Sequence, residues 1–420
     1  MGKLAKLFDR VREIAKKGDM LLLALCVVAT GFGLVMIYAA TATGDYKRYI
    51  IIQSGCLIAG IIIYFFLTPF DIDILAGQRT LLFIFNTLFI GLLLVFGIEG
   101  TSGNRSWLSF PFLPFNIQPA EVCKITYVLI LARTLSVNQT RTSSFKCVGQ
   151  LVFHMIFIVG MYVVISRDTG VALIFIFIFL AMAYIGGVNG LWFLAGAGAF
   201  AIAAPTLWAT VMREDQKNRI LALFDSSIDP NGLGVMWQTN QNLKTLRNGG
   251  LSGQGLFNGM MTNSGALPAR HTDSIFSTIG EQLGLIGCLV VLILLLAIVA
   301  RVIYVGLKTP DYQNRLICMG IAAMFLFQII INVGVCLGLL PVIGLALPFF
   351  SYGGSSILTS FIAMGIVSGI KMKPVPDSGA HYIRPYCYNN PAANCSGIFL
   401  HIFKNSVHHK RVAINRRKPI

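Results

Sequence analysis

Long apolar stretches separated by short polar segments fill the sequence between residues 20 and 370. A helix that crosses the hydrocarbon core of a bilayer needs about 20 mostly apolar residues, and ten stretches approach this length. The fourth is short and charged, and only Arg167 and Asp168 separate the fifth from the sixth. The predicted spans are 20–40, 49–67, 81–98, 118–132, 148–166, 169–187, 189–212, 283–300, 316–337 and 346–370. The pattern predicts an all-α polytopic membrane protein with about ten transmembrane helices and one large loop, between the seventh and the eighth.

The composition agrees with a membrane protein. Hydrophobic residues make up 55% of the 420 residues and charged residues only 12%, about half the charged share of soluble domains. This composition excludes a disordered chain, a secreted disulfide scaffold and an ordinary cytosolic enzyme. The nine cysteines lie mostly in apolar runs and form no CxxC pair, so no disulfide framework is indicated.

The distribution of Lys and Arg predicts the orientation, because these residues accumulate in cytoplasmic loops. With the N-terminus inside, 22 of the 33 Lys and Arg residues lie in cytoplasmic segments and four in the short outer loops. The 213–282 loop holds six more, but loops of this length cross a membrane largely regardless of charge. We therefore expect both termini in the cytoplasm and the 213–282 loop on the outer face.

Two basic segments flank the predicted membrane domain, which covers residues 20–372. Residues 1–19 form a basic amphipathic segment that either lies on the inner leaflet or is a solvated lead-in that only sets the topology. Residues 373–420 are rich in Pro, Asn, His and Arg and are predicted to be a flexible cytoplasmic tail. A zinc site in the tail is disfavoured by irregular ligand spacing; its ligands would be Cys387, Cys395, His401 and His408.

Several polar groups are candidates for chemistry. The Gly-rich 213–282 loop is either solvent-exposed, which its spacing alone favours, or folded back where protein shields its backbone. Glu121 and Lys124 are three residues apart and are predicted to pair on one helical face, either in packing or towards a substrate. Asp168 beside Arg167 is interpreted as a loop pair or helix cap rather than a catalyst. The absence of GxxxxGK[ST], GxGxxG after a strand and HExxH disfavours an ATP-driven pump and a metalloprotease.

Three ordered blocks resemble the SEDS family (shape, elongation, division and sporulation), which includes RodA and FtsW. Residues 118–124 read QPAEVCK and resemble the family's QPSEFAK. Residues 267–284 contain LPARHTDSIF and IGEQLG and resemble LPE-x-HTDFIF followed by IGEELG. Residues 340–356 contain LPV and PFFSYGGSS and resemble LLPVTG followed by LPFISYGGSS. The resemblance covers roughly residues 15–372.

The resemblance implies a peptidoglycan glycosyltransferase of the bacterial cytoplasmic membrane, active in cell elongation or division. Such proteins polymerise lipid II, a disaccharide-pentapeptide on undecaprenyl pyrophosphate, and act with a class B penicillin-binding protein. Asp273 matches the family's essential acidic residue and is the candidate catalytic group. The candidate substrate contacts are Arg105, Trp107, Glu121, Lys124, His271, Ser351 and Tyr352.

The residues suit this chemistry. Glycan formation needs a base for the attacking hydroxyl, which Asp273 would supply, and positive charge for the departing pyrophosphate. Arg105, Lys124 or a bound divalent cation are alternatives for that charge, and no metal ligands are assigned. Inversion by direct displacement would require no covalent nucleophile.

The sequence departs from the family pattern at three places. Ala269 stands where the family has Glu, Ser274 replaces Phe, and residues 166–170 read SRDTG where QPDLGT is usual. Two alternatives to the enzyme remain. A lipid II flippase would also show polar groups in spans and Gly-interrupted helices, although it should line a path to both faces. A non-catalytic scaffold that recruits a penicillin-binding protein is disfavoured by the presence of Asp273.

Overall fold

The computed structural model describes residues 12–42, 46–99, 104–111 and 113–373. Most of the predicted basic segment and all of the tail after residue 373, including the disfavoured zinc ligands, lie outside these residues. The long helices within the described part are α2 (Met20–Thr41), α3 (Tyr46–Leu67), α5 (Arg79–Phe96), α6 (Pro119–Val137), α7 (Phe145–Met161), α8 (Thr169–Ile185), α9 (Gly190–Thr210), α13 (Ile275–Lys308), α14 (Tyr312–Cys336) and α15 (Gly354–Met372). Each overlaps one predicted span.

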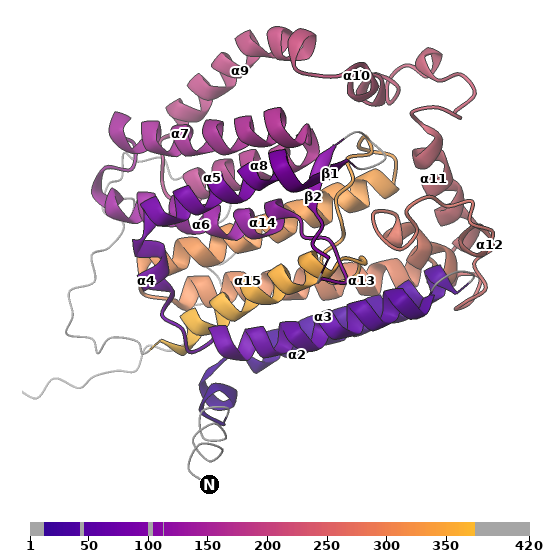
Figure 1. Cartoon of the computed structure of the whole chain (residues 1–420), viewed down its shortest axis with the longest axis horizontal. Helices are drawn as coiled ribbons and strands as arrows, with labels where there is room; N and C mark the ends of the chain where they lie inside the picture. Colours follow the sequence, from indigo (N-terminus) through magenta and orange to yellow (C-terminus); the bar gives the residue numbers. More distant parts are fainter. Residues whose placement is uncertain (1–11, 43–45, 100–103, 112, 374–420) are drawn as a thin grey trace, which may run out of the picture. The chain divides into compact units, whose positions relative to one another are not determined.

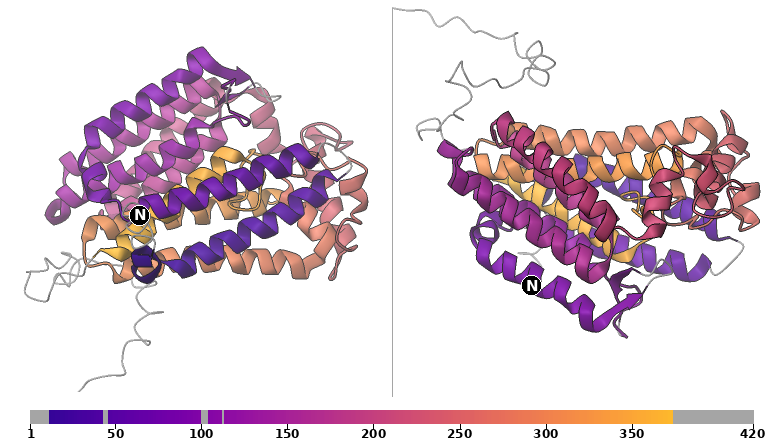
Figure 2. Two further views of the ribbon diagram at one scale, coloured as in Figure 1. Left: turned by 60° about the horizontal axis from the view of Figure 1, so that its bottom comes forward. Right: turned by 90° about the horizontal axis from the view of Figure 1, so that it is seen from above.

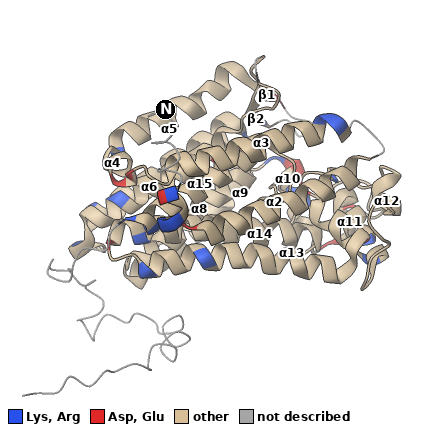
Figure 3. Ribbon diagram, turned by 90° about the horizontal axis from the view of Figure 1, so that it is seen from below, with Lys and Arg blue, Asp and Glu red and all other residues tan. Residues whose placement is uncertain are grey.

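Eight of these described helices, α7 with its continuation included, are long and apolar enough to cross a membrane. Helix α8 is shorter, with 17 residues, and α6 carries the charged residues Glu121, Lys124 and Arg133. A π-helical turn, η2 (Tyr162–Ser166), extends α7, and the short helix α4 (Ile72–Gly77) joins α3 to α5. Figure 3 shows the charged residues mostly near the two ends of the bundle, as expected for helices surrounded by lipid.

The helices differ greatly in how much protein surrounds them. In the 18-residue apolar stretches of α14 and of α15, 72% of the residues are buried inside the protein, whereas no residue of α9 is buried. Figures 1 and 2 accordingly show α9 at the edge of the bundle. Close packing at the centre depends on small residues. A Cβ atom at Gly60 of α3 would lie 2.7 Å from the ring of Phe361 on α15.

The structure differs from the prediction most clearly in two helices and one hairpin. Helix α13 begins at Ile275, eight residues before the predicted span. Its first two turns contain polar residues, and the prediction counted only the apolar run that follows them. Helix α15 begins only at Gly354, because residues 346–353 are irregular. A two-stranded antiparallel hairpin was not predicted; its strands are β1 (Gly97–Glu99) and β2 (Arg105–Leu108).

The large loop is folded rather than simply exposed. It forms α10 (Glu214–Leu221), η3 (Ser226–Ile228), α11 (Trp237–Gly249) and α12 (Met260–Asn263). Helix α11 packs against α13 and α14 and buries Thr239, Asn242 and Thr245. The solvent-exposed interpretation is therefore wrong for the part of the loop around α11.

Two glycines allow this docking. A Cβ at Gly249 would lie 1.8 Å from the carbonyl oxygen of Gly280. Gly284 interrupts α13 with a φ of 67°, and its missing side chain makes room for the Leu251 carbonyl. Since only glycine adopts such positive φ values without strain, the sequence fixes where the loop meets the helix.

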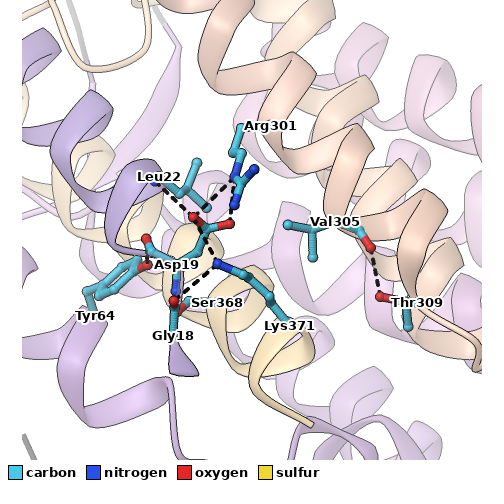
Figure 4. A network of polar contacts seen from close by, with 9 residues as sticks. All are labelled: Gly18, Asp19, Leu22, Tyr64, Arg301, Val305, Thr309, Ser368 and Lys371. Carbon is cyan, nitrogen blue, oxygen red and sulfur yellow. Dashed lines mark hydrogen bonds and ion pairs between the residues drawn. The ribbon is translucent and has the colours of Figure 1, made fainter. Parts of the chain in front are cut away.

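The buried carboxylate of Asp19 connects the N-terminus of α2 to α13 and α15, near the C-terminal ends of those two helices (Figure 4). Asp19 is fully buried. Its carboxylate accepts a hydrogen bond of 2.8 Å from Arg301 Nε and lies 3.5 Å from Lys371 Nζ. Its backbone N–H donates to Ser368, and its carbonyl accepts from Tyr64. The carboxylate also caps α2 by accepting the N–H of Leu22. One residue therefore connects four helices.

We predict that Asp19→Asn destabilises the protein by about 3 kcal/mol. This is the low end for breaking a buried ion pair, because Arg301 and Lys371 keep partial access to solvent. The matched control is Asp71→Asn, since Asp71 also caps a helix but pairs with Lys373 at an exposed position, where pairs contribute about 0–1 kcal/mol. Thermal unfolding in detergent compares them, and equal shifts would contradict the role given to Asp19.

Candidate active site

Asp273 lies directly before α13, outside the membrane-spanning segments, and its side chain is partly exposed. Its backbone is held firmly: the carbonyl accepts from Asn332 Nδ2 of α14 at 2.9 Å and from the Cys336 thiol. The next residue, Ser274, donates its N–H to the carbonyl of Ala269. The carboxylate is therefore presented on a fixed turn rather than on a free loop.

The irregular chain between α14 and α15 forms the other wall of the site. Residues 340–353, hereafter the 340–353 segment, lack regular structure, yet Leu347, Phe349 and Phe350 are buried. Irregular backbone of this kind needs hydrogen-bond partners from the protein. Asn332 Nδ2 donates to the carbonyl of Leu345, and Gln53 of α3 bonds both the Ser351 carbonyl and the Gly353 N–H.

Predicted site residues from two distant parts of the sequence meet here. Ser351 Oγ donates to the carbonyl of Thr272 at 2.7 Å, and the Tyr352 N–H donates to the carbonyl of His271 at 2.8 Å. The His271 ring lies 4.7 Å from the Tyr49 ring and 5.7 Å from the Tyr352 ring. The structure thus brings His271, Ser351 and Tyr352 together around the Asp273 turn.

Burial raises the pKa of the Asp273 carboxyl to about 6, and the negative charge of Asp168 contributes to the same shift. A carboxylate with this pKa is a stronger base than an ordinary one, yet it is still mostly ionised at neutral pH. Burial, followed by the charge of Arg270, lowers the pKa of His271. The imidazole is therefore neutral at pH 7 and does not offset the charge of Asp273.

Asp168 acts on the site from the N-terminus of α8. Its side chain accepts the N–H of Val171, so the predicted helix cap is confirmed. It also accepts a hydrogen bond of 2.8 Å from Ser106 Oγ on β2. Burial raises the pKa of Asp168, and hydrogen bonds together with the charge of Arg213 oppose the shift. Asp168 is thus a cap that also tunes Asp273.

The hairpin residues that were predicted as substrate contacts are placed differently. Arg105 donates to Glu99 across the hairpin, and both side chains are about half exposed. Trp107 is 36% exposed and is paired with Ile98 in the hairpin. The residue between them, Ser106, contacts the site instead, because its hydroxyl donates to the Asp168 carboxylate.

The predicted pair on α6 is confirmed. Lys124 Nζ lies 2.8 Å from Glu121, and Lys124 is almost fully buried. Glu121 also accepts a hydrogen bond from Thr359 of α15. Among the described contacts, this pair joins α6 to α15 and makes no hydrogen bond to the Asp273 turn.

Sequence reasoning missed several residues that form the site. Tyr49, Gln53 and Asn332 lie in apolar stretches with no motif of their own, and Ser106 lies between the predicted contacts Arg105 and Trp107. A buried amide within a predicted span was the available signal for Gln53 and Asn332, because such groups need partners. Within the described part of the chain, no group of three or more His, Cys, Asp or Glu residues could hold a metal ion.

Comparison with known proteins identifies the family. The family model described as "Cell cycle protein", which covers FtsW, RodA and SpoVE, matches residues 19–374. The chain belongs to the SEDS family. It is therefore a multi-pass membrane protein, and the predicted all-α polytopic membrane fold is confirmed.

Curated relatives match over most of their length. The probable peptidoglycan glycosyltransferase FtsW of Trichlorobacter lovleyi is 32% identical over 86% of this chain and 96% of its own. Stage V sporulation protein E of Bacillus subtilis is 30% identical over 84% of this chain and 96% of its own. The peptidoglycan glycosyltransferase MrdB of Escherichia coli is 30% identical over 64% of this chain and 71% of its own.

Solved structures share the fold. A chain from a peptidoglycan synthase complex that coordinates polymerization and crosslinking superposes with a TM-score of 0.71 at 28% identity, over 84% of this SEDS chain and 97% of that chain. The rod shape determining protein RodA of Thermus thermophilus superposes with a TM-score of 0.62 at 26% identity, over 84% and 96%.

We predict that Asn332→Leu lowers both stability and activity. It leaves the carbonyls of Asp273 and Leu345 without their amide donor, and each unpaired buried group costs about 1–3 kcal/mol. The matched control is Gln328→Leu, because Gln328 is a buried amide one turn away on α14 that bonds neither carbonyl. Thermal unfolding and initial rates measure the two effects. An Asn332→Leu protein that behaves like the control would show that Asn332 does not hold the turn.

Proposed function

We propose that this protein polymerises lipid II at the outer face of the bacterial cytoplasmic membrane, with Asp273 as the general base. The SEDS family member is a peptidoglycan glycosyltransferase of cell-wall synthesis. The observation that carries the specific proposal is a partly accessible carboxylate with a pKa near 6 on a rigid turn. The bias of Lys and Arg towards one set of loops supports the orientation.

The proposed reaction is a direct displacement at an anomeric carbon. A sugar hydroxyl of one substrate attacks the anomeric carbon of another as the bond from that carbon to the pyrophosphate oxygen breaks. Asp273 accepts the hydroxyl proton, and the pyrophosphate departs with the bonding electrons. An α-linked donor gives a β-linked product, so one carboxylate acting as base is sufficient and no covalent intermediate forms.

Cations near the Asp273 turn suit the departing pyrophosphate. The charge of Arg213 acts on Asp168, and the charge of Arg270 acts on His271. Arg105 and Lys124, the candidates from sequence, have the carboxylate partners Glu99 and Glu121, and Arg213 likewise pairs with Asp215. We favour Arg213 and Arg270 as the groups that stabilise negative charge on the leaving group, because their charges act on Asp168 and His271 beside the Asp273 turn.

A class B penicillin-binding protein is the proposed partner. The support is the similarity to a chain from a complex that couples polymerization to crosslinking. The partner would crosslink the strands that the SEDS protein extends, in elongation or in division.

We predict that Asp273→Asn reduces lipid II polymerisation by about 10²–10⁴-fold, the usual contribution of a general base. Asn keeps the shape of the side chain and leaves the backbone contacts of residue 273 in place. Gel analysis of glycan strands made by the purified protein with its partner measures the effect. Near-normal polymerisation by Asp273→Asn would remove this residue from the mechanism.

The rate should follow the ionisation of Asp273. With a pKa of about 6, kcat/KM should be nearly constant above pH 7 and should fall about tenfold per pH unit well below pH 6. Asp168→Asn should move this acid limb to lower pH, since removing a nearby negative charge makes ionisation of Asp273 easier. Asn also preserves the helix cap.

The control for that shift is Asp225→Asn, which removes an exposed carboxylate of the 213–282 loop. This variant should leave the acid limb in place. An acid limb that stays unchanged in Asp168→Asn would show that Asp168 exerts no charge effect on the catalytic group.

A further inference from the structure

Three cationic side chains gather around the exposed ring of Tyr304, near the C-terminal end of α13. Arg301 Cζ and Lys308 Nζ each lie 4.9 Å from the centre of that ring. The spacing of residues 301, 304 and 308 places their side chains on one face of the helix. The charge of Lys371, near the end of α15, acts on the same tyrosine. These four residues are hereafter the Tyr304 patch.

The Tyr304 patch carries more positive than negative charge. Arg301 and Lys371 share one carboxylate, that of the fully buried Asp19 (Figure 4). Lys308 is exposed and has no carboxylate partner among the residues that the structure describes. Within the described part of the chain, one carboxylate therefore serves three cations, and the surplus of positive charge faces outwards.

The cations also keep donors for a ligand. Within the described residues, the hydrogen bonds of Arg301 come from its Nε and go to Asp19, and a guanidinium has further N–H donors on its terminal nitrogens. Lys371 donates to the carbonyl of Gly18, and its side chain is 35% exposed. Arg and Lys groups that are accessible in this way are common ligands of phosphate oxygens.

Exposed apolar side chains adjoin the Tyr304 patch. Val290 and Ile293 are exposed on α13 and share the helical face of Tyr304 by their spacing. Leu21 is exposed on α2, which packs against α13. Apolar surface that ends in an aromatic ring and cations is typical of the level at which a membrane helix meets lipid headgroups. A lipid can therefore contact this region with both its acyl chains and its phosphate.

The surplus charge determines which headgroup is favoured. A phosphatidylcholine headgroup carries a cation beside its phosphate, which the patch repels, whereas a phosphatidylglycerol headgroup is a net anion. We propose that the Tyr304 patch is a binding site for one anionic phospholipid, whose phosphate is held by Arg301, Lys308 and Lys371. This site is separate from the Asp273 turn and does not depend on the proposed function.

A lipid bound there acts on the packing of the bundle. Arg301 and Lys371 hold Asp19, the residue that connects α2 to α13 and α15. A phosphate beside these two cations reduces their mutual repulsion while they contact the same carboxylate. Bound anionic lipid should therefore raise the stability of the folded protein, because the unfolded chain lacks this arrangement of charges.

Native mass spectrometry of the full chain, released from detergent, measures lipid that stays bound. The probe is phosphatidylglycerol, and phosphatidylcholine with the same acyl chains is the comparison. We expect one phosphatidylglycerol to bind at least about fivefold more tightly, the effect of one cation near anionic lipid. It should also raise the unfolding temperature, and both effects should weaken at high salt. Equal binding of the two lipids would overturn the proposal.

One exposed lysine provides the variant that locates the site. Lys308→Gln removes a charge of the Tyr304 patch and leaves the contacts of Asp19 in place. The matched control is Lys146→Gln, which removes an exposed lysine from the first turn of α7. Lys308→Gln should weaken phosphatidylglycerol binding about fivefold, whereas Lys146→Gln should not change it. Equal affinities of the two variants would show that the lipid does not bind at the Tyr304 patch.

Two competition experiments test other occupants. Glycerol 3-phosphate offers the same phosphate chemistry without acyl chains, so displacement of phosphatidylglycerol at equal concentration would assign the patch to a soluble phosphate. Complete loss of the lipid when the class B penicillin-binding protein is added would assign the patch to that protein. Either displacement would overturn the proposal, and we expect the lipid to stay bound in both. Glycan synthesis plays no part in these measurements, so an inactive protein tests the site equally well.

Discussion

Irregular backbone inside a helical membrane bundle must find its hydrogen-bond partners within the protein, and this constraint shapes the site. The 340–353 segment receives these bonds from Gln53 of α3 and Asn332 of α14. The same Asn332 amide also bonds Asp273. The groups that satisfy the segment therefore also position the carboxylate, which explains why polar residues far apart in the sequence converge on one turn.

Electrostatics follow from that placement. Because the Asp273 turn is packed between the 340–353 segment and α14, burial is the main cause of the raised pKa, and the charge of Asp168 adds to it. Asp168 remains close because it caps α8 and bonds Ser106 of the hairpin. A base of intermediate strength thus arises from structural elements that each have an independent role in packing.

The sequence predicted the helices well, because span length and apolar content are local properties. It also predicted the Glu121–Lys124 pair, since spacing along one helix determines that contact. It could not predict that Gln53 would bond Ser351, 298 residues away, because no local pattern encodes such a contact. The break before α15 was hidden for a related reason: the buried residues Leu347 and Phe350 are as apolar as a helix would be.

The central claim is that Asp273 is the base whose ionisation controls the reaction. Infrared difference titration of the wild-type protein against Asp273→Asn measures the protonation of this carboxyl without any turnover. The account predicts a single carboxyl band that titrates with a pKa of about 6 and matches the acid limb of kcat/KM. A carboxyl that titrates near the ordinary value for Asp, or one that is still protonated at neutral pH, would contradict the account.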